Sequence, residues 1–331
     1  MIAVGTKYNL LDVASSKDPS GKLAKVAEIY QQSNPMLEHI PFFEGNLDTG
    51  ERITARKTLG TPTWRRVNEE VAPSKATVSQ VDEVTGMLED YSEVDEKLVK
   101  MALDKEGFLL LQSRAKMEAM AQEVAGTYLY GNILTSPSEF HGFMPRLNAL
   151  NSTVGETPIV LAGGGSSTDN NSILYVGWGE GKVYGIYPKG SKAGLEFENL
   201  GKVTKETTSG LREVYRSHFI WECGLAVADP RYVARIANID ISDLATFGSG
   251  SDTSANLVNL MIDMLSFIPN PESVNGRIYC PRAVWAGLTK MGLSDKNRNI
   301  TTAVVDGKFI THFFGVPVHK MDQMTTEAKV S

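Results

Sequence analysis

Apolar residues recur at helical spacing along the segment from Ser92 to Gly131. The members of this stripe are Leu98, Met101, Ala102, Leu109, Leu110, Met117, Met120, Ala121, Val124 and Tyr128. Ser92 followed by Asp95 resembles a capping box, and Gly131 with Asn132 is a stop signal, so the pattern predicts one long helix with a kink at Gly107. A rod of roughly 60 Å is too long for one small core, so part of it needs a sheet or a neighbouring chain.

The segment ahead of this stripe has the pattern of extended strands. Its apolar positions lie on two arms, at Ile53, Ala55 and Leu59 and then at Val78, Val81, Val84, Met87 and Leu88. Gly60-Thr61-Pro62 gives turn signals between the arms, and residues 65–77 are dense in charge. The pattern predicts a long hairpin with a polar, proline-interrupted rim. Because a two-stranded ribbon is marginal in water, something outside it must cover it.

Further strand signals follow in the second half of the chain. Residues 173–177 and 182–187 are typical of paired strands around a glycine-rich turn, and residues 215–225 form a strand with one apolar face. Asp306-Gly307 between two apolar pairs is a strong hairpin signal.

Helix signals alternate with these strands. Residues 20–32 have the spacing of a short amphipathic helix that Pro35 stops, and residues 257–265 form another helical stripe. Pro281 begins a further helix and Gly292 ends it. Long strands, separate helices and no internal repeat predict an α+β fold.

Composition narrows the class of protein. With 331 residues and 42% apolar content the chain has enough material for a substantial core. Its 33 Lys and Arg against 39 Asp and Glu give a net charge of −6, which argues against a dedicated nucleic-acid binder. Cys223 and Cys280 are too few and too distant for a disulfide framework and indicate a reducing compartment. No apolar run approaches a membrane span, so we expect the product to stay in the cytoplasm where it is made.

The candidates for enzyme chemistry are scattered. Cys223 beside Glu222 falls on the apolar face of a strand, where cysteine packs as a small hydrophobe. Residues 177–182 lack the spacing of a phosphate-binding loop, and His312 and His319 lack nearby partners for zinc. We therefore assign no catalytic, cofactor-binding or metal-binding residue.

The charged hairpin rim has two interpretations. The basic residues are Arg56, Lys57, Arg65, Arg66 and Lys75, and they could contact nucleic acid. Glu69 and Glu70 lie among them and weaken their field, so contacts with complementary charges on another protein chain are favoured.

Motifs in a particular order along the chain resemble a known family. The order is an arm with Asn9-Leu10-Leu11-Asp12 and Asn34-Pro35-Met36, the hairpin, the long helix, Phe140-His141-Gly142-Phe143, Trp178-Gly179, Asp229-Pro230-Arg231-Tyr232, Tyr279-Cys280-Pro281-Arg282 and Phe314-Gly315-Val316-Pro317-Val318 with Asp322. This order over nearly the whole chain resembles the major capsid proteins of tailed phages with the Hong Kong 97 fold. The best match is the branch of short-tailed phages of the epsilon-fifteen kind.

The resemblance implies a division of the chain. Residues 1–45 would be the amino-terminal arm, 46–90 the extended loop with its flanking strands, and 91–145 the spine helix of a peripheral domain. Residues 146–300 would be the central, axial domain, and 301–331 would be strands that return to the peripheral domain. The site residues expected to contact another subunit are Trp64, Arg65, Arg66, Glu69, Glu70 and Lys75.

The resemblance also implies a structural function. Copies of the chain would assemble in the host cytoplasm into hexamers and pentamers of an icosahedral shell around a double-stranded DNA genome. The expected partners are a portal protein, a scaffold and a cement or decoration protein, with weak non-specific DNA contact and no membrane, cofactor or catalysis. The alternatives are an encapsulin-type compartment of the same fold and a cytosolic enzyme.

Overall fold

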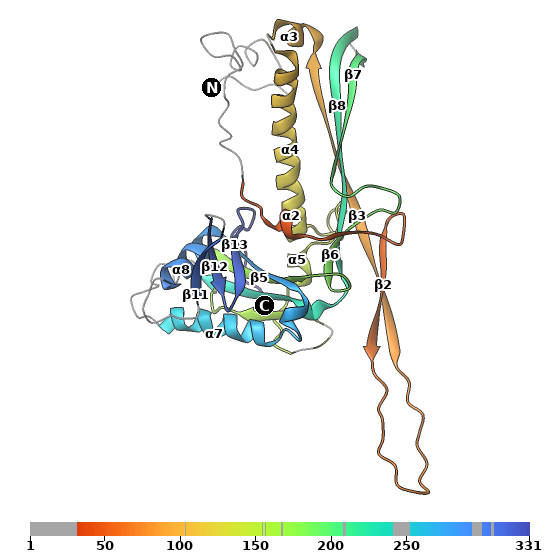
Figure 1. Cartoon of the computed structure of the whole chain (residues 1–331), viewed down its shortest axis with the longest axis vertical. Coiled ribbons are helices and arrows are strands. Elements are labelled where there is room, and N and C mark those ends of the chain that lie inside the picture. Colours follow the sequence, from red (N-terminus) through yellow and green to blue (C-terminus); the bar gives the residue numbers. More distant parts are fainter. Residues whose placement is uncertain are drawn as a thin grey trace. The chain divides into compact units, whose positions relative to one another are not determined.

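A computed structural model describes residues 32–331 apart from 103, 154, 156, 167, 208–209, 241–251, 293–299 and 306–307. The chain divides into two compact units, whose elements are labelled in Figure 1. Unit 1 holds Met1–Gln32, Met87–Val124 and Gly194–Glu222; unit 2 holds Ser33–Gly86, Ala125–Ala193 and Cys223–Ser331. The helix expected over residues 20–32 lies outside the described residues, except for Gln32.

The elements combine helices and strands, as an α+β fold requires. The helices are α2 (Met36–His39), α3 (Glu96–Met101), α4 (Lys105–Tyr130), α5 (Phe143–Arg146), α7 (Asp252–Ser266) and α8 (Arg282–Gly292), with 3₁₀ turns at Pro230–Tyr232 and Pro271–Ser273. The strands are β1 (Phe42–Glu44), β2 (Gly50–Thr58), β3 (Thr77–Asp95), β4 (Ile159–Ala162), β5 (Asn170–Trp178), β6 (Val183–Tyr187), β7 (Leu195–Thr207), β8 (Gly210–Val227), β9 (Val233–Asp240), β10 (Asn275–Cys280), β11 (Ile300–Val305), β12 (Lys308–Phe313) and β13 (Val316–Lys320).

The single helix predicted from Ser92 to Gly131 is two helices with a later start. Strand β3 continues through Ser92 to Asp95, whose side chain caps α3 by accepting a hydrogen bond from the Lys97 amide at 2.9 Å. Helix α3 ends at Met101, and α4 begins at Lys105. The break therefore lies before the predicted kink at Gly107. The end of the pattern is confirmed, because α4 stops at Tyr130.

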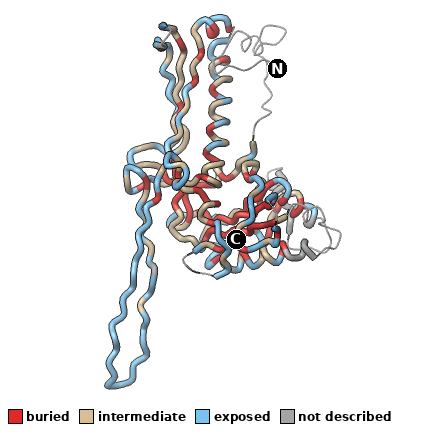
Figure 2. Tube along the Cα trace, turned by 180° about the vertical axis from the view of Figure 1, so that it is seen from behind, coloured by how far each residue is buried: buried red, intermediate tan, exposed pale blue. Residues whose placement is uncertain are grey.

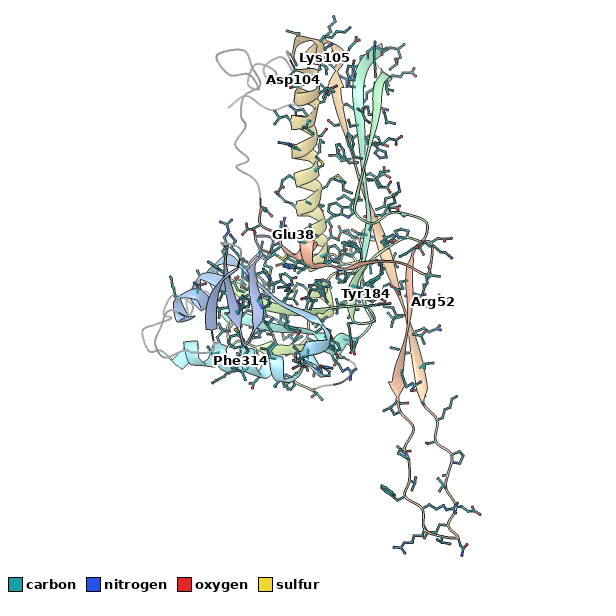
Figure 3. All side chains as sticks on the ribbon, viewed as in Figure 1. Glu38, Arg52, Asp104, Lys105, Tyr184 and Phe314 are labelled. Atoms are coloured by element: carbon teal, nitrogen blue, oxygen red, sulfur yellow. The ribbon has the colours of Figure 1, made fainter. Side chains whose placement is uncertain are left out.

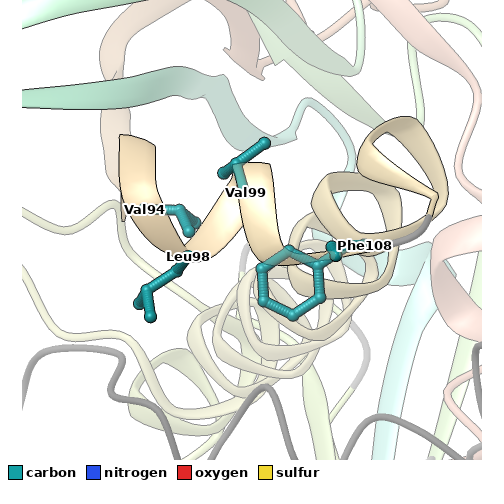
Figure 4. Packing of buried hydrophobic residues seen from close by; sticks show 5 residues of the cluster. Val94, Leu98, Val99 and Phe108 are labelled. Carbon is teal, nitrogen blue, oxygen red and sulfur yellow. The ribbon is translucent and has the colours of Figure 1, made fainter. Parts of the chain in front are cut away.

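A small apolar cluster packs α3 and the start of α4 in unit 1 (Figure 4). Its buried members are Val94, Leu98, Val99, Ala102 and Phe108, and Leu109 and Tyr215 pack against them. The Phe108 ring, fully buried, lies beyond the break between the helices. Burial of these side chains, at roughly 1.5–3 kcal/mol for each large one, holds the broken helix together without a continuous backbone ladder.

Unit 1 also contains a long ribbon held by an ion cluster. Strands β7 and β8 pair antiparallel from Leu195 and Trp221 to Thr207 and Gly210. The Glu93 carboxylate of β3 accepts hydrogen bonds from Lys205 on β7 and from Arg216 Nη2 on β8, the latter at 2.8 Å. Burial by itself raises the pKa of Glu93, but these hydrogen bonds outweigh it and lower the pKa.

Strand β5 is the centre of the sheet of unit 2. Its 9 residues are all buried, and it pairs antiparallel with β9 on one edge and β10 on the other. The predicted pairing of residues 173–177 with 182–187 is therefore wrong, because β5 meets β6 only at Trp178 and Val183. A continuous apolar run such as this strand is typical of a central position, where both faces are covered.

Several local predictions for unit 2 are confirmed. The helical stripe at 257–265 is α7, and α8 follows Pro281 and ends at Gly292. Strands β11 and β12 pair antiparallel, with Val305 opposite Lys308, as the Asp-Gly signal predicts. Strand β13 then pairs with β12 and runs parallel to β10, with Ile278 opposite Val318. Strand β13 thus lies beside β10 in unit 2.

A buried arginine fixes the last residues of the chain in unit 2. The Arg235 side chain is 3% exposed and donates hydrogen bonds to Ser172 Oγ at 2.9 Å and to the Leu147 carbonyl at 2.8 Å. Its Nη2 also forms an ion pair with Glu327. Because a buried charge without a partner is costly, Arg235 requires Glu327 and thereby holds the carboxyl-terminal segment on β9.

Asp322 joins three distant parts of the same unit. Its carboxylate accepts hydrogen bonds from Arg282 Nε at 2.6 Å, from Arg282 Nη2 at 2.8 Å and from the Ser33 amide at 3.0 Å. The Arg282 guanidinium, helped by the Ser33 amide, lowers the pKa of Asp322 to about 2. The chain on the amino-terminal side of α2 is thus tied to the residues that follow β13.

We predict that Asp322→Asn destabilises unit 2 at neutral pH and that the difference shrinks in acid. A carboxyl with a lowered pKa in the folded state contributes stability above the pKa of the unfolded chain, near 4, and loses it as the pH falls through about 2. After allowance for solvent screening the contribution is about 1 kcal/mol. Urea unfolding midpoints at pH 6 and pH 2.5 test this expectation, and exposed Glu272→Gln is the control. An equal loss at both pH values would contradict it.

Candidate assembly surface

The predicted hairpin is confirmed, and its two arms are β2 and the first half of β3. The strands pair antiparallel from Gly50 opposite Val84 to Thr58 opposite Thr77, with one irregularity between Arg56 and Thr58. Beyond Thr58 and Thr77 no further strand pairing is present in residues 59–76. The structure therefore has a paired stem and an unpaired tip.

A two-pronged ion pair anchors the base of the stem. Glu83 on β3 is 6% exposed, and its two carboxylate oxygens accept hydrogen bonds from Arg146 Nη1 and Nη2, both at 2.6 Å. Arg146, at the end of α5, also donates to the carbonyls of His141 at 3.0 Å and Gly142 at 3.2 Å. Parallel charge-assisted hydrogen bonds of this kind fix orientation as well as distance. The pair therefore sets the direction in which the hairpin leaves its anchor.

Strand β2, the other arm of the stem, is anchored beside Glu83. Glu51 on β2 accepts a hydrogen bond from the Tyr184 hydroxyl at 2.9 Å, and burial raises the pKa of Glu51. Gly50, with φ 152°, lies so close to β3 that an added Cβ would be 2.0 Å from the Glu83 carbonyl oxygen. Only glycine fits this approach, because neither the backbone conformation nor the space allows a side chain.

Between its base and the tip, the stem is stabilised by pairs of exposed side chains that join its two strands. Arg52 and Asp82 pair at 2.6 and 2.8 Å, and the Arg52 hydrogen bonds lower the pKa of Asp82. The hydroxyls of Thr58 and Thr77 lie 2.6 Å apart at the last rung. Figure 3 shows Arg52 on the stem and Tyr184 at its base. Cross-strand pairs keep the register of a ribbon that has little core of its own.

The tip is exposed along almost all of its length (Figure 2). Trp64 is fully exposed, and Leu59 and Val67 are nearly so. A single turn organises the end, where the Glu69 amide donates to the Arg66 carbonyl at 3.2 Å and Asn68 has φ 72°. Large apolar side chains in water are unfavourable, so this surface fits a protein partner better than solvent.

The predicted contact residues all lie on this tip. Trp64, Arg65, Arg66, Glu69, Glu70 and Lys75 are exposed. Arg66 and Glu69 share the turn, since the Arg66 amide donates to Glu69 Oε2 at 3.2 Å. Within the described part of the chain, no side chain forms a hydrogen bond or ion pair with Arg65, Glu70 or Lys75. Their charges are available to an external partner.

The residues that anchor the stem were not predicted from the sequence. Glu83 and Arg146 are 63 positions apart, and Glu51 and Tyr184 are 133 apart. Glu83 follows Asp82 and precedes Val84, so no alternation of polar and apolar residues marks it as the buried one. Nothing in the sequence identified its partner.

The candidates for enzyme chemistry occupy structural positions. Burial raises the pKa of the Cys223 thiol to about 12, so the thiol stays protonated. Gly177 and Trp178 belong to buried β5, where Trp178 Nε1 donates to the Tyr279 hydroxyl at 2.9 Å. His319, whose pKa burial lowers to about 4, lies against His39 with ring centroids 4.4 Å apart.

Within the described residues, no group of three or more His, Cys, Asp or Glu side chains is arranged to hold a metal ion. Among the helices of this part of the chain, none has the length and apolar character to cross a membrane.

Comparison with known proteins gives matches over nearly the whole chain. Residues 18–331 match the model of the family described as major capsid protein GP7. A chain in the structure of bacteriophage Epsilon15 is similar at 25% identity and TM-score 0.76, covering 100% of this chain and 99% of that chain. The comparison with curated proteins finds no match.

Two more distant likenesses cover about two thirds of the chain. The capsid of a native GTA particle has 10% identity and TM-score 0.45, covering 68% of this chain and 95% of that one. The holo-SrpI encapsulin complex from Synechococcus elongatus PCC 7942 has 12% identity and TM-score 0.41, covering 70% and 97%. Neither is close enough to bear on function. The full-length match to the Epsilon15 chain confirms the predicted α+β fold of the Hong Kong 97 type.

We predict that Arg146→Ala loosens the hairpin stem and destabilises unit 2 by roughly 3 kcal/mol, because it leaves the Glu83 charge buried without its partner. Denaturant unfolding gives the free energy, and hydrogen exchange of the β2 and β3 amides shows whether the stem opens first. The double variant Glu83→Gln/Arg146→Ala should recover part of the loss. Arg52→Ala, which removes the exposed pair instead, is the control. Equal effects of Arg52→Ala and Arg146→Ala would contradict the anchoring role.

Proposed function

Because the chain belongs to the family of the major capsid protein GP7, it is a virion structural protein, and we propose that residues 59–76 provide a principal contact between its copies. The protein forms the icosahedral capsid shell of a bacteriophage. Each copy touches several others, so modest pair energies sum over a closed shell to a very stable particle.

The observation that supports this role is the exposure of the tip. Residues 59–76 add almost nothing to the core of their own subunit, yet they include a fully exposed Trp64 and several exposed aliphatic side chains. Tryptophan and arginine are enriched among the residues that dominate protein–protein binding. A stable interface buries on the order of 1,600 Å², and a loop laid across a neighbouring subunit contributes a large part of that area.

The charges of the tip suit the same role. Arg65 and Arg66 precede Glu69 and Glu70 on the exposed turn, so the tip presents both signs within a few residues. A patch of mixed charge specifies the register of a protein partner, and it repels a partner that presents the same pattern in the wrong orientation. Uniformly negative DNA meets no such complementarity there.

We propose a division of the chain into functional segments. Residues 1–45 act as an arm, 46–90 as the extended loop, 91–145 as the spine region and 146–300 as the central domain that meets its copies in hexamers and pentamers. The parallel pairing of β13 with β10 supports assigning the closing strands, within residues 301–331, to the central domain.

The remaining partners follow from the function. A shell that fills with double-stranded DNA needs a portal and an assembly scaffold, and a cement protein would decorate its outside. Assembly takes place in the host cytoplasm, the packaged DNA is contacted weakly, and the protein catalyses no reaction. The net charge of −6 supports weak DNA contact, since a strongly basic lining would grip the genome.

Deletion of the tip tests whether folding and assembly can be separated. Replacement of residues 60–76 by a short Gly-Ser link should leave a soluble chain with native circular dichroism and a cooperative melt, because the tip is not part of the core. The same chain should form no shells in sedimentation or negative-stain images. A matched control inserts the same link after Gly190, in an exposed loop of unit 2. Normal particles from the deletion variant, or its wholesale insolubility, would refute the proposal.

Charge reversal on the tip tests the electrostatic part. Glu69→Lys/Glu70→Lys should lower particle yield several-fold while the subunit melts as the wild type does, because exposed charges add little to the fold. The effect should weaken as salt rises and screens the contact. Glu196→Lys/Glu198→Lys, on the exposed part of β7, is the control for net charge. Wild-type yield from the tip variant at every salt concentration would remove the claim.

A further inference from the structure

The connection between β12 and β13 is a tight two-residue turn with an unusual first residue. Phe313 and Val316 are the last paired positions, and Phe314 and Gly315 join them with φ 48° and φ 81° (Figure 3). Positive φ at both central residues is the signature of a type I′ turn, which matches the twist of a hairpin. Asn-Gly is the preferred pair there, and Gly315 fits its position.

Phe314 does not fit its own position. A bulky side chain at positive φ is a genuine outlier, since its Cβ approaches the following carbonyl oxygen. The other two described non-glycine residues with positive φ are Asn68 and Asn238, and asparagine tolerates this region. Backbone strain of this kind persists where the surrounding structure or a function requires it.

The Phe314 ring adds little to the packing of its own subunit that would offset this backbone strain. Phe314 is 57% exposed, and among the described residues its one ring contact is an edge-on approach to Phe313 at a centroid distance of 5.1 Å. Phe313 is 1% exposed in β12, whereas more than half of the neighbouring Phe314 surface faces away from the core. Neither the turn nor the core of unit 2 therefore explains why this position holds phenylalanine.

We propose that Phe314 is an assembly contact whose ring packs against an apolar surface on a second copy of this chain. This inference rests on the proposed function, because shell assembly surrounds each copy with others. Residues 313–318 carry no charged side chain, so the turn presents an uncharged, aromatic knob to its partner. A knob on one copy and its acceptor on another form a heterologous contact, in which the two copies use different surfaces.

The substitution Phe314→Asn should have opposite effects on folding and on assembly: it should stabilise the turn and weaken the contact between copies. Asparagine suits the type I′ turn, so dissociated full-length subunits should melt at a temperature raised by on the order of 2 °C. The same variant should need at least about tenfold more protein to form shells, since buried aromatic anchors dominate interfaces. Phe314→Tyr keeps the ring and should assemble as the wild type does.

A matched control removes another exposed apolar side chain from unit 2. Leu134 is 86% exposed in a turn without positive φ, and Leu134→Asn should change neither melting nor assembly. Wild-type assembly of Phe314→Asn would overturn the proposal, as would a lowered melting temperature, which would give the ring a structural role. An equal assembly defect in Leu134→Asn would also overturn it. Failure of the wild-type chain to form shells at all would instead refute the proposed function.

Discussion

The ion pair between Glu83 and Arg146 is the interaction on which the hairpin depends. A two-stranded ribbon has no core, so its direction and register must be imposed from its base. Arg146 does this with parallel hydrogen bonds to the carboxylate and two more to main-chain carbonyls of residues 141 and 142. The geometry of the pair is thus transmitted along the β2–β3 ladder to a tip that makes almost no contacts of its own. Gly50 allows the close approach that the ladder needs at this point.

Arginine–carboxylate ion pairs also join distant segments at two other places in unit 2. Arg235 binds Glu327 and thereby the carboxyl-terminal segment, and Arg282 binds Asp322 and thereby the chain at Ser33. In each case arginine joins segments that are remote in sequence, because its planar fork satisfies several acceptors at once. Arg235 is buried, so the loss of Glu327 would be costly, and this cost holds the carboxyl-terminal segment in place; the Arg282 side chain is largely exposed.

How much the sequence could predict depends on the range of the signals. Local signals worked well: the Asp-Gly pair predicted the β11–β12 hairpin, Pro281 and Gly292 bounded α8, and the apolar arms with turn residues between them predicted the β2–β3 hairpin. The start of the long helix was misplaced because the polar and apolar residues from Ser92 to Asp95 suit a strand end as well as a helix cap. Here β3 continues and Asp95 takes the cap.

Non-local features left no comparable signal. The partners of β5 were misassigned because a fully buried strand gives no alternation that would identify its neighbours, and its edges go to β9 and β10. Charge density located the tip, and the order of motifs indicated the family. The anchor at Glu83 required knowledge of a contact across 63 positions.

Positions that stabilise the subunit are separate from the positions that we propose for assembly. The buried glutamate and arginine residues have their partners within the subunit, and their substitution acts on folding. The charges of the tip and the ring of Phe314 have little or no such role, and Phe314 even adopts a conformation that its own hairpin disfavours. Local rules of turn chemistry should fail where a residue serves a neighbour. The mismatch at Phe314 therefore distinguishes assembly from folding more sharply than exposure alone does, since exposed apolar side chains are common on any protein surface.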